Sequence, residues 1–133
     1  MSVYVTDTHA LLWYFTGQHR MLSTRAFEVF EQAEHCQAFI YVPTVSLWEV
    51  SRLDHVGAIE LHEPFEDWVD ALSVQPCFEF VPLDERVIIE SRKYNFNRDI
   101  FDAAIVATAI VKDLPLVTRD TAITDSGVIE VYW

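Results

Sequence analysis

The sequence predicts an α/β fold, with a mostly parallel sheet of four to five strands flanked by helices. Short apolar runs of strand length alternate with segments of helical periodicity along the chain. Residues 38–42 (AFIYV) are continuously apolar, as in a strand buried on both faces. Residues 100–112 are rich in alanine and apolar on almost every side, as in a helix packed against a sheet. With 133 residues, 51% of them hydrophobic, we expect a single domain over 1–133.

In the first half of the chain, β-branched and aromatic residues mark the strands, and capping residues mark the helices. Ser23 is placed to cap an amphipathic helix whose apolar stripe includes Phe27 and Phe30. Gly17 and Pro43 separate neighbouring elements. We expect, in order, a strand over 3–5, a helix over 8–14, a helix from residue 23, a strand over 38–42 and a helix over 45–53.

The second half continues the alternation. Pro64 suits the first turn of a helix, and Asp84 suits the N-cap of another. We expect helices from 64 and from 84 toward 94, a strand over 78–81, a polar loop over 95–98, the apolar helix over 100–112, strands over 116–118 and 128–132, and a turn at 119–120.

The chain is strongly acidic, with 9 Lys and Arg against 21 Asp and Glu and a formal net charge of -12. Taken alone, this charge argues against nucleic-acid binding, which normally needs a basic surface. Bound cations or a basic protein partner would resolve the conflict.

The two cysteines, Cys36 and Cys77, form neither C-x-x-C nor a metal-type spacing, so we expect buried, reduced thiols. The N-terminus lacks a basic leader, and no apolar run approaches the ~18 residues that span a bilayer. We therefore expect a cytoplasmic protein without a membrane segment.

Four acids stand at the expected strand-to-helix junctions: Asp7, Glu49, Asp102 and Asp120. Each has a structural explanation of its own. Asp7 suits an N-cap, Ser46-x-x-Glu49 reads as a capping box, Asp102 suits a helix first turn, and Asp120 suits a turn.

Taken together, the four acids indicate a metal site. The junctions that follow parallel strands share one edge of the sheet, so these carboxylates are expected to meet there. Clustered carboxylates repel one another unless a cation is present, and hard oxygen ligands suit Mg²⁺ or Mn²⁺. Such a site activates water and stabilises a phosphodiester transition state. The chain contains no zinc motif, P-loop or G-x-S-x-G elbow to suggest another chemistry.

Five segments, V-T-D-T-H-A-L-L-W, S-L-W-E-V-S-R-L, D-I-F-D-A-A-I-V-A-T-A, L-V-T-R-D and the terminal V-Y-W, resemble a PIN-domain protein in the same order along the chain. Within that family the chain looks like a VapC-type toxin ribonuclease of a type II toxin–antitoxin pair. The resemblance implies a Mg²⁺- or Mn²⁺-dependent endoribonuclease, a homodimer and inhibition by a cognate VapB-like antitoxin.

The same resemblance assigns the four acids as catalytic metal ligands. It implies that Asp7 and Asp102 bind the metal directly, that Glu49 and Asp120 act directly or through water, and that Thr118 is an additional contact. Similar proteins often carry proline and arginine where this chain has Ile100 and Ala103. The departure leaves the acids in place and removes any contact that the arginine makes.

Five cations lie near these motifs in sequence, and the resemblance to a ribonuclease makes them candidates for RNA phosphates. We expect Arg98 and Arg119 to contact the substrate; the other three cations are Arg52, Arg92 and Lys93. An acidic groove would also attract a basic antitoxin segment whose arginine reaches the carboxylates.

Two alternatives remain open from the sequence. One is a non-catalytic PIN-like module whose acids only dock a partner. The other is a Mg²⁺-binding phosphoacceptor receiver domain, which would need paired acids after the first strand and a late lysine. Here Asp7 is flanked by Thr6 and Thr8, and T-R-D stands where the lysine should be.

Overall fold

The computed structural model describes all residues 1–133 and contains one five-stranded sheet in the order β3-β2-β1-β4-β5. All four strand pairings are parallel. The α/β fold with a parallel sheet is therefore confirmed. The strands are β1 (Ser2–Thr6), β2 (Ala38–Pro43), β3 (Phe78–Val81), β4 (Leu116–Val117) and β5 (Val131–Tyr132).

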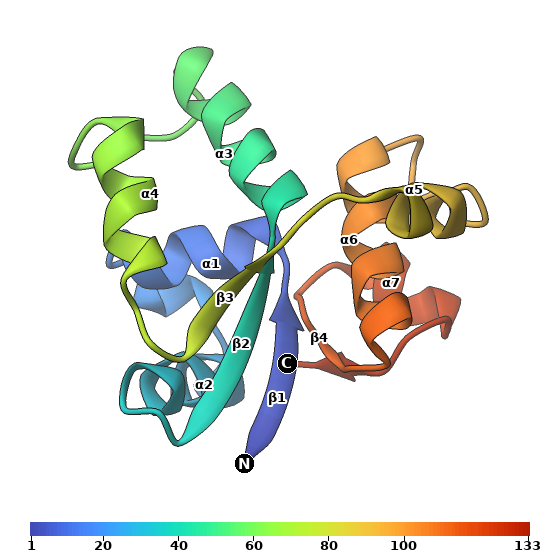
Figure 1. Ribbon diagram of the computed structural model, residues 1–133, viewed down its shortest axis with the longest axis horizontal. Helices are drawn as coiled ribbons and strands as arrows, with labels where there is room; N and C mark the ends of the chain where they lie inside the picture. The colour runs from blue at the N-terminus through green and yellow to red at the C-terminus, as the bar shows by residue number, and fades with distance from the viewer.

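Helices cover both faces of this sheet (Figure 1). On one side lie α1, α2 and α4, with α3 rising beyond the strand ends, and on the other side lie α5, α6 and α7. The helices are α1 (Thr8–Phe15), the 3-10 turn η1 (His19–Met21), α2 (Thr24–Glu34), α3 (Thr44–His55), α4 (Phe65–Ser73), α5 (Glu85–Ser91), α6 (Ile100–Lys112) and α7 (Thr121–Ser126).

The core consists of two apolar clusters, one on each face of the sheet. Successive side chains of a strand point to opposite faces, and β1 shows this directly: Tyr4 joins the cluster of 18 buried residues around Phe30, and Val5 joins the cluster of 9 around Ile105. The apolar helix α6 supplies much of the second cluster, as its composition predicts. Burial of this helix fixes its first turn, and with it Asp102, against the sheet.

Several predicted boundaries agree closely with the structure, and a few do not. The strand over 78–81 and the helix over 100–112 are confirmed. The last strand is shorter than predicted, since only Val131–Tyr132 pairs with β4. Residues 121–126 form helix α7, which was not expected after the turn at 119–120. β2 is fully buried on one face only, because Phe39 and Tyr41 on the other face are half-buried.

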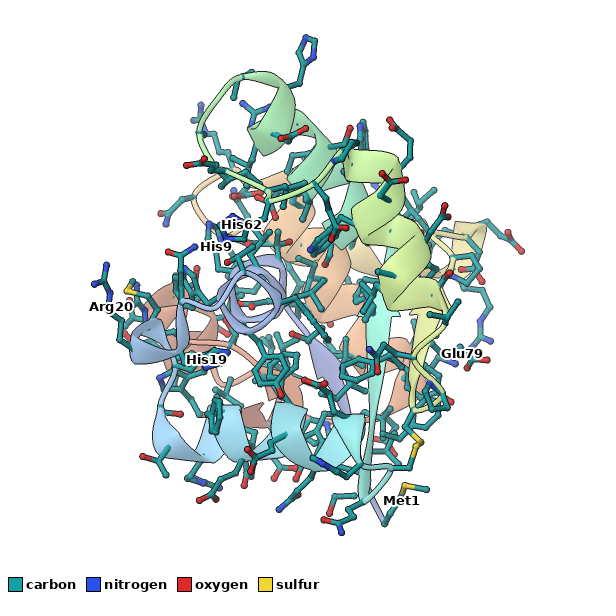
Figure 2. All side chains as sticks on the ribbon, turned by 90° about the vertical axis from the view of Figure 1, so that its left-hand side faces the viewer. Met1, His9, His19, Arg20, His62 and Glu79 are labelled. Carbon is teal, nitrogen blue, oxygen red and sulfur yellow. A yellow bond between two sulfur atoms is a disulfide. The ribbon has the colours of Figure 1, made fainter.

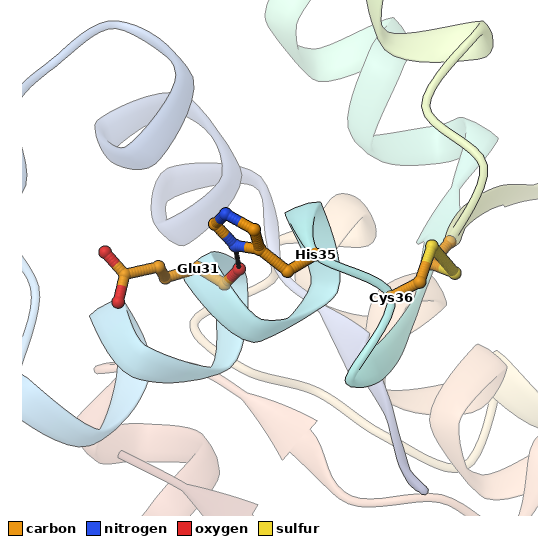
Figure 3. Close-up of a disulfide and its surroundings, with 4 residues drawn as sticks. Glu31, His35 and Cys36 are labelled. Carbon is orange, nitrogen blue, oxygen red and sulfur yellow. Dashed lines mark hydrogen bonds between the residues drawn. A yellow bond between two sulfur atoms is a disulfide. The ribbon is translucent and has the colours of Figure 1, made fainter.

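The prediction of two reduced thiols was wrong. Cys36 and Cys77 form a disulfide that links the turn after α2 to the residue before β3 (Figure 3). Cys36 is exposed and adopts a positive φ of 53°, in a turn where Nδ1 of His35 contacts the carbonyl oxygen of Glu31 at 2.9 Å. The bond lies near Met1, well away from His9 at the start of α1 (Figure 2). No helix of the protein has the length and apolarity needed to cross a bilayer.

Candidate active site

Asp7 lies at the junction of β1 and α1, and both of its carboxylate oxygens are held. Its Oδ1 accepts the backbone N–H of Ala10 at 2.9 Å, which is the predicted N-cap, and its Oδ2 accepts the hydroxyl of Thr118 at 2.5 Å. Burial raises the pKa of Asp7, and the two hydrogen bonds act in the opposite direction. The side chain is thus fixed in orientation and destabilised as an anion by its surroundings.

Glu49 has no capping role. Helix α3 begins at Thr44 directly after Pro43, so Ser46 already lies inside the helix, and its buried hydroxyl has no hydrogen-bond partner. The capping-box interpretation was therefore wrong, because the N-cap is Pro43, nearly one helical turn before Ser46. Glu49 is 8% exposed, forms no ion pair and faces the pocket described below. With the structural explanation removed, a buried and unpaired carboxylate remains, which is costly unless something binds it.

Asp102 lies in the first turn of α6, beside its N-cap Asp99, which accepts the backbone N–H groups of Phe101 and Asp102. The pKa of Asp102 rises to about 7, first because of burial and then because of the negative charges of Asp99, Asp120, Glu49 and Asp7. The protonated and ionised forms of Asp102 are therefore both populated near neutral pH. A cation placed among these carboxylates would drive that proton off.

Asp120 caps helix α7, with Oδ1 accepting the N–H of Ile123 at 3.0 Å. Its own N–H donates to the Thr118 hydroxyl oxygen at 3.1 Å. That hydroxyl donates to Asp7, so Thr118 connects two of the four acids. Thr118 itself is fully buried.

All four acids line one open pocket of about 530 Å³, at the edge of the sheet where the parallel strands end. Asp99 adds a fifth carboxylate. Arg119 is the one lysine or arginine that lines this pocket. Arg98 instead lines a neighbouring pocket, together with Arg92 and Tyr94. The lining residues are Asp7, His9, Trp13, Glu49, Asn97, Asp99, Asp102, Arg119, Asp120, Thr121 and Ala122.

The donor chemistry of this pocket suits a hard divalent cation. In the conformation described, no three His, Cys, Asp or Glu side chains converge closely enough to hold a metal ion together. Mg²⁺ is commonly bound by only one or two carboxylates and keeps several waters, so a closed cage is not required. Burial and the negative charges of the neighbouring acids together raise the pKa of Asp102, and a cation bound among these acids would offset both effects. The residues present therefore fit Mg²⁺ or Mn²⁺.

A family model described as "PIN domain" matches residues 4–127, nearly the whole chain. The chain belongs to the PIN-domain family. A search among curated proteins finds no significant match. The family resemblance inferred from the five sequence segments is thus confirmed.

Solved structures share the fold of this PIN domain along nearly its full length. The VapBC2 structure of Rickettsia felis, bound to a promoter DNA fragment, aligns with a TM-score of 0.68 and 12% identity, covering 98% of this chain and 99% of that one. FitAcB of Neisseria gonorrhoeae aligns with a TM-score of 0.62 and 20% identity, covering 98% of this chain and 96% of that one. A toxin–antitoxin complex of Klebsiella pneumoniae aligns with a TM-score of 0.59 and 22% identity, covering 98% of this chain and 95% of that one. The predicted PIN-like fold is confirmed.

Sheet order separates this PIN domain from the phosphoacceptor alternative. Receiver domains are built on the doubly wound order 2-1-3-4-5, whereas this sheet runs β3-β2-β1-β4-β5. The receiver interpretation is set aside.

Sequence reasoning missed part of the pocket of this PIN domain. Neither His9 nor Trp13 is among the site residues predicted from the sequence, yet both line the pocket. Trp13 is half-buried in the pocket wall, whereas the neighbouring Leu11 and Leu12 are buried. The spacing of His9 and Trp13, four residues apart in the helix that starts after Asp7, places both on one face beside that acid.

Proposed function

We propose that this PIN domain is a Mg²⁺- or Mn²⁺-dependent endoribonuclease and the toxin of a type II toxin–antitoxin pair. One observation supports the proposal above all others: four acids far apart in sequence, at the N-caps of α1 and α7 and within α3 and α6, line a single open pocket. Such convergence of buried or half-buried carboxylates destabilises a fold, so a functional reason for it is required.

In this proposal Asp7 and Asp102 are the direct metal ligands, and Glu49 and Asp120 contribute directly or through water. A divalent cation there would supply Lewis acidity toward a phosphodiester and would activate water. Thr118 orients Asp7 through its hydroxyl, and Asp102 gives up its proton as the site is filled. Cation binding should therefore strengthen as the pH rises through about 7.

The partner proposal follows from the structural neighbours and from the charge. The similar structures include VapBC and FitAB complexes, and the Klebsiella pneumoniae structure is a toxin–antitoxin complex. A net charge of -12, with five carboxylates in one pocket, suits a basic antitoxin segment whose arginine pairs with the acids. We also propose a homodimer, as the family resemblance implies, acting on cytoplasmic RNA.

The first test is cleavage of a mixed RNA pool by the purified chain, with Mg²⁺, with Mn²⁺ and with EDTA. Asp7→Asn and Asp102→Asn should each abolish cutting, while Asp70→Asn, an exposed acid of α4, should leave it unchanged. Circular dichroism checks that each variant folds. If folded wild-type protein cuts with EDTA present, or if Asp102→Asn still cuts, the metal-dependent mechanism is wrong.

The non-catalytic docking module is the second candidate, and the single cation among five pocket acids favours it over an RNA site. Expression in growing cells separates the two functions. A nuclease toxin should arrest growth, and Asp102→Asn or a co-expressed antitoxin should restore it. A docking module should bind the basic partner without arresting growth, and its folded wild-type chain should leave the RNA pool intact.

A further inference from the structure

One wall of the acid pocket differs chemically from the rest. It contains two rings, His9 and Trp13, and one strong cation, Arg119. His9 and Trp13 lie on the same face of α1, with ring centroids 5.7 Å apart. Helix α1 starts directly after Asp7, so this aromatic wall lies beside the carboxylates.

Arg119 is held by an aromatic ring and not by an acid. Its guanidinium carbon lies 4.5 Å from the ring centroid of Trp13. Five carboxylates line the same pocket, yet Arg119 pairs with none of them, because the one ion pair of the chain joins Lys93 to Glu90. The exposed guanidinium therefore keeps its N–H donors for an outside acceptor, while the cation–π contact fixes its position.

Trp13 is itself supported from within the protein. The ring of Trp133, the last residue, packs edge-on against it at 6.4 Å between centroids. The indole is half-buried and still contributes to the open pocket. The indole and the Arg119 guanidinium that lies over it thus give the pocket a planar surface of the kind on which nucleobases stack.

Because the pocket is acidic, an RNA ligand needs the aromatic wall as a source of binding energy that does not depend on charge. Phosphates are repelled by five carboxylates, and one arginine offsets only part of that repulsion. Stacking of a base on an aromatic ring is independent of net charge and tolerates every base. Only an unpaired base can use it, because bases within a duplex are already stacked on their neighbours.

We propose that Trp13 and Arg119, with His9 beside them, form a subsite for one unpaired nucleotide of an RNA chain. The base stacks on the aromatic wall, Arg119 binds an adjacent phosphate, and the next phosphodiester lies over the carboxylates. This inference rests on the nuclease function proposed above and assigns one nucleotide position of the RNA substrate to these three residues.

Binding of short RNA tests the subsite without cleavage. The Asp102→Asn background prevents turnover and removes one repelling charge, and fluorescence anisotropy of labelled oligomers gives the affinity. The probes are hexauridylate, hexa-adenylate and a fully abasic hexamer with the same ribose–phosphate backbone. Base-bearing hexamers should bind at least about fivefold more tightly than the abasic one, since the phosphates are the same in all three.

Substitutions then show which residues cause the difference in affinity between base-bearing and abasic RNA. Trp13→Leu should abolish the preference for base-bearing RNA, and Trp13→Phe should keep most of it. Arg119→Gln should weaken every probe equally and lower the salt dependence by about one ion, with partial recovery in Arg119→Lys. Arg25→Gln is the matched control, because Arg25 also lies over an aromatic ring, that of Tyr132 at 4.1 Å, but outside the pocket. It should bind all probes as the parent protein does.

Equal affinity for base-bearing and abasic hexamers overturns the subsite, as does the absence of RNA binding or a base preference that survives in folded Trp13→Leu. These results are distinguishable from failure of the nuclease proposal. Metal-dependent cutting by wild type together with equal affinities refutes the subsite alone. Base-dependent binding without cutting upholds the subsite and refutes the nuclease.

Discussion

The Thr118 hydroxyl donates a 2.5 Å hydrogen bond to Oδ2 of Asp7 across 111 residues of sequence. The register of β1 and β4 accounts for this contact, because Thr6 lies opposite Val117 and the next residue of each strand follows alongside. The same hydroxyl oxygen accepts the N–H of Asp120. One threonine thus fixes the relative positions of two acids that come from opposite ends of the chain.

Replacing Thr118 by valine keeps the shape of the side chain and removes both hydrogen bonds. The Asp7 carboxylate and the Asp120 N–H then lose a partner, so the free energy of unfolding should fall by about 1–3 kcal/mol. The pKa of Asp7 should rise further, because the Thr118 bond lowers it. Urea denaturation at pH 7 measures the first effect. Thr118→Ser keeps the hydroxyl, so its free energy of unfolding should fall much less. Equal stability of the valine variant and the wild type would refute the role given to this contact.

The stability of the metal-free protein should depend on Asp102 and on pH. The pKa of Asp102 is about 7 in the folded protein and 3.8 for an unperturbed aspartate, so between these values the folded chain holds a proton that the unfolded chain has lost. Stability therefore falls as the pH rises from about 4 to about 7. Because the side chain is only half-buried and partly screened, we expect a loss of about 1–2 kcal/mol.

Denaturation in EDTA at pH 5 and pH 8 measures this dependence. Asp102→Asn should be more stable than wild type at pH 8 and should show a smaller decline between the two values. Asp70→Asn, on the exposed surface of α4, should decline as wild type does. If Asp102→Asn lowers stability equally at both pH values, the raised pKa assigned to Asp102 is wrong.

The disulfide should contribute to stability and leave the acid pocket unaffected. Its cysteines are 41 residues apart, and closing such a loop stabilises a fold by up to about 4 kcal/mol through the unfolded chain. Reduction, or Cys36→Ser with Cys77→Ser, should lower the urea midpoint by a corresponding amount. Mn²⁺ affinity should stay the same, because the bond lies away from the start of α1 (Figure 2). A midpoint that does not change on reduction would contradict this expectation.

The sequence carries enough local information to predict most of the elements. Helix α6 combines the N-cap Asp99 with an almost wholly apolar surface. Strand β3 (FEFV) alternates apolar and polar residues between Pro76 and Pro82, so the bounds of both elements were predicted correctly. Helix α7 was missed because six residues, T-A-I-T-D-S, carry too little periodicity to distinguish a helix from a loop. Its N-cap, Asp120, was read as a turn residue for the same reason.

Interactions between distant segments account for the remaining differences. The capping-box pattern at Ser46 fails because Pro43 ends β2 and α3 starts at once, with Thr44 accepting the N–H of Leu83 39 residues away. The disulfide joins two turns whose proximity depends on β2 pairing with β3. Pairing of Arg119 with Trp13 likewise depends on β4 lying beside β1. No local pattern contains these relationships.

The central claim, that the four acids form a divalent-cation site, is tested most directly by titrating the metal-free protein with Mn²⁺ and measuring binding calorimetrically at pH 6 and pH 8. We predict saturable Mn²⁺ binding that is tighter at pH 8 and that releases protons at pH 6. Binding should be lost in Asp7→Asn and in Asp102→Asn but kept in Asp70→Asn. Binding of equal strength in Asp102→Asn, or no binding by folded wild-type protein, would contradict the claim.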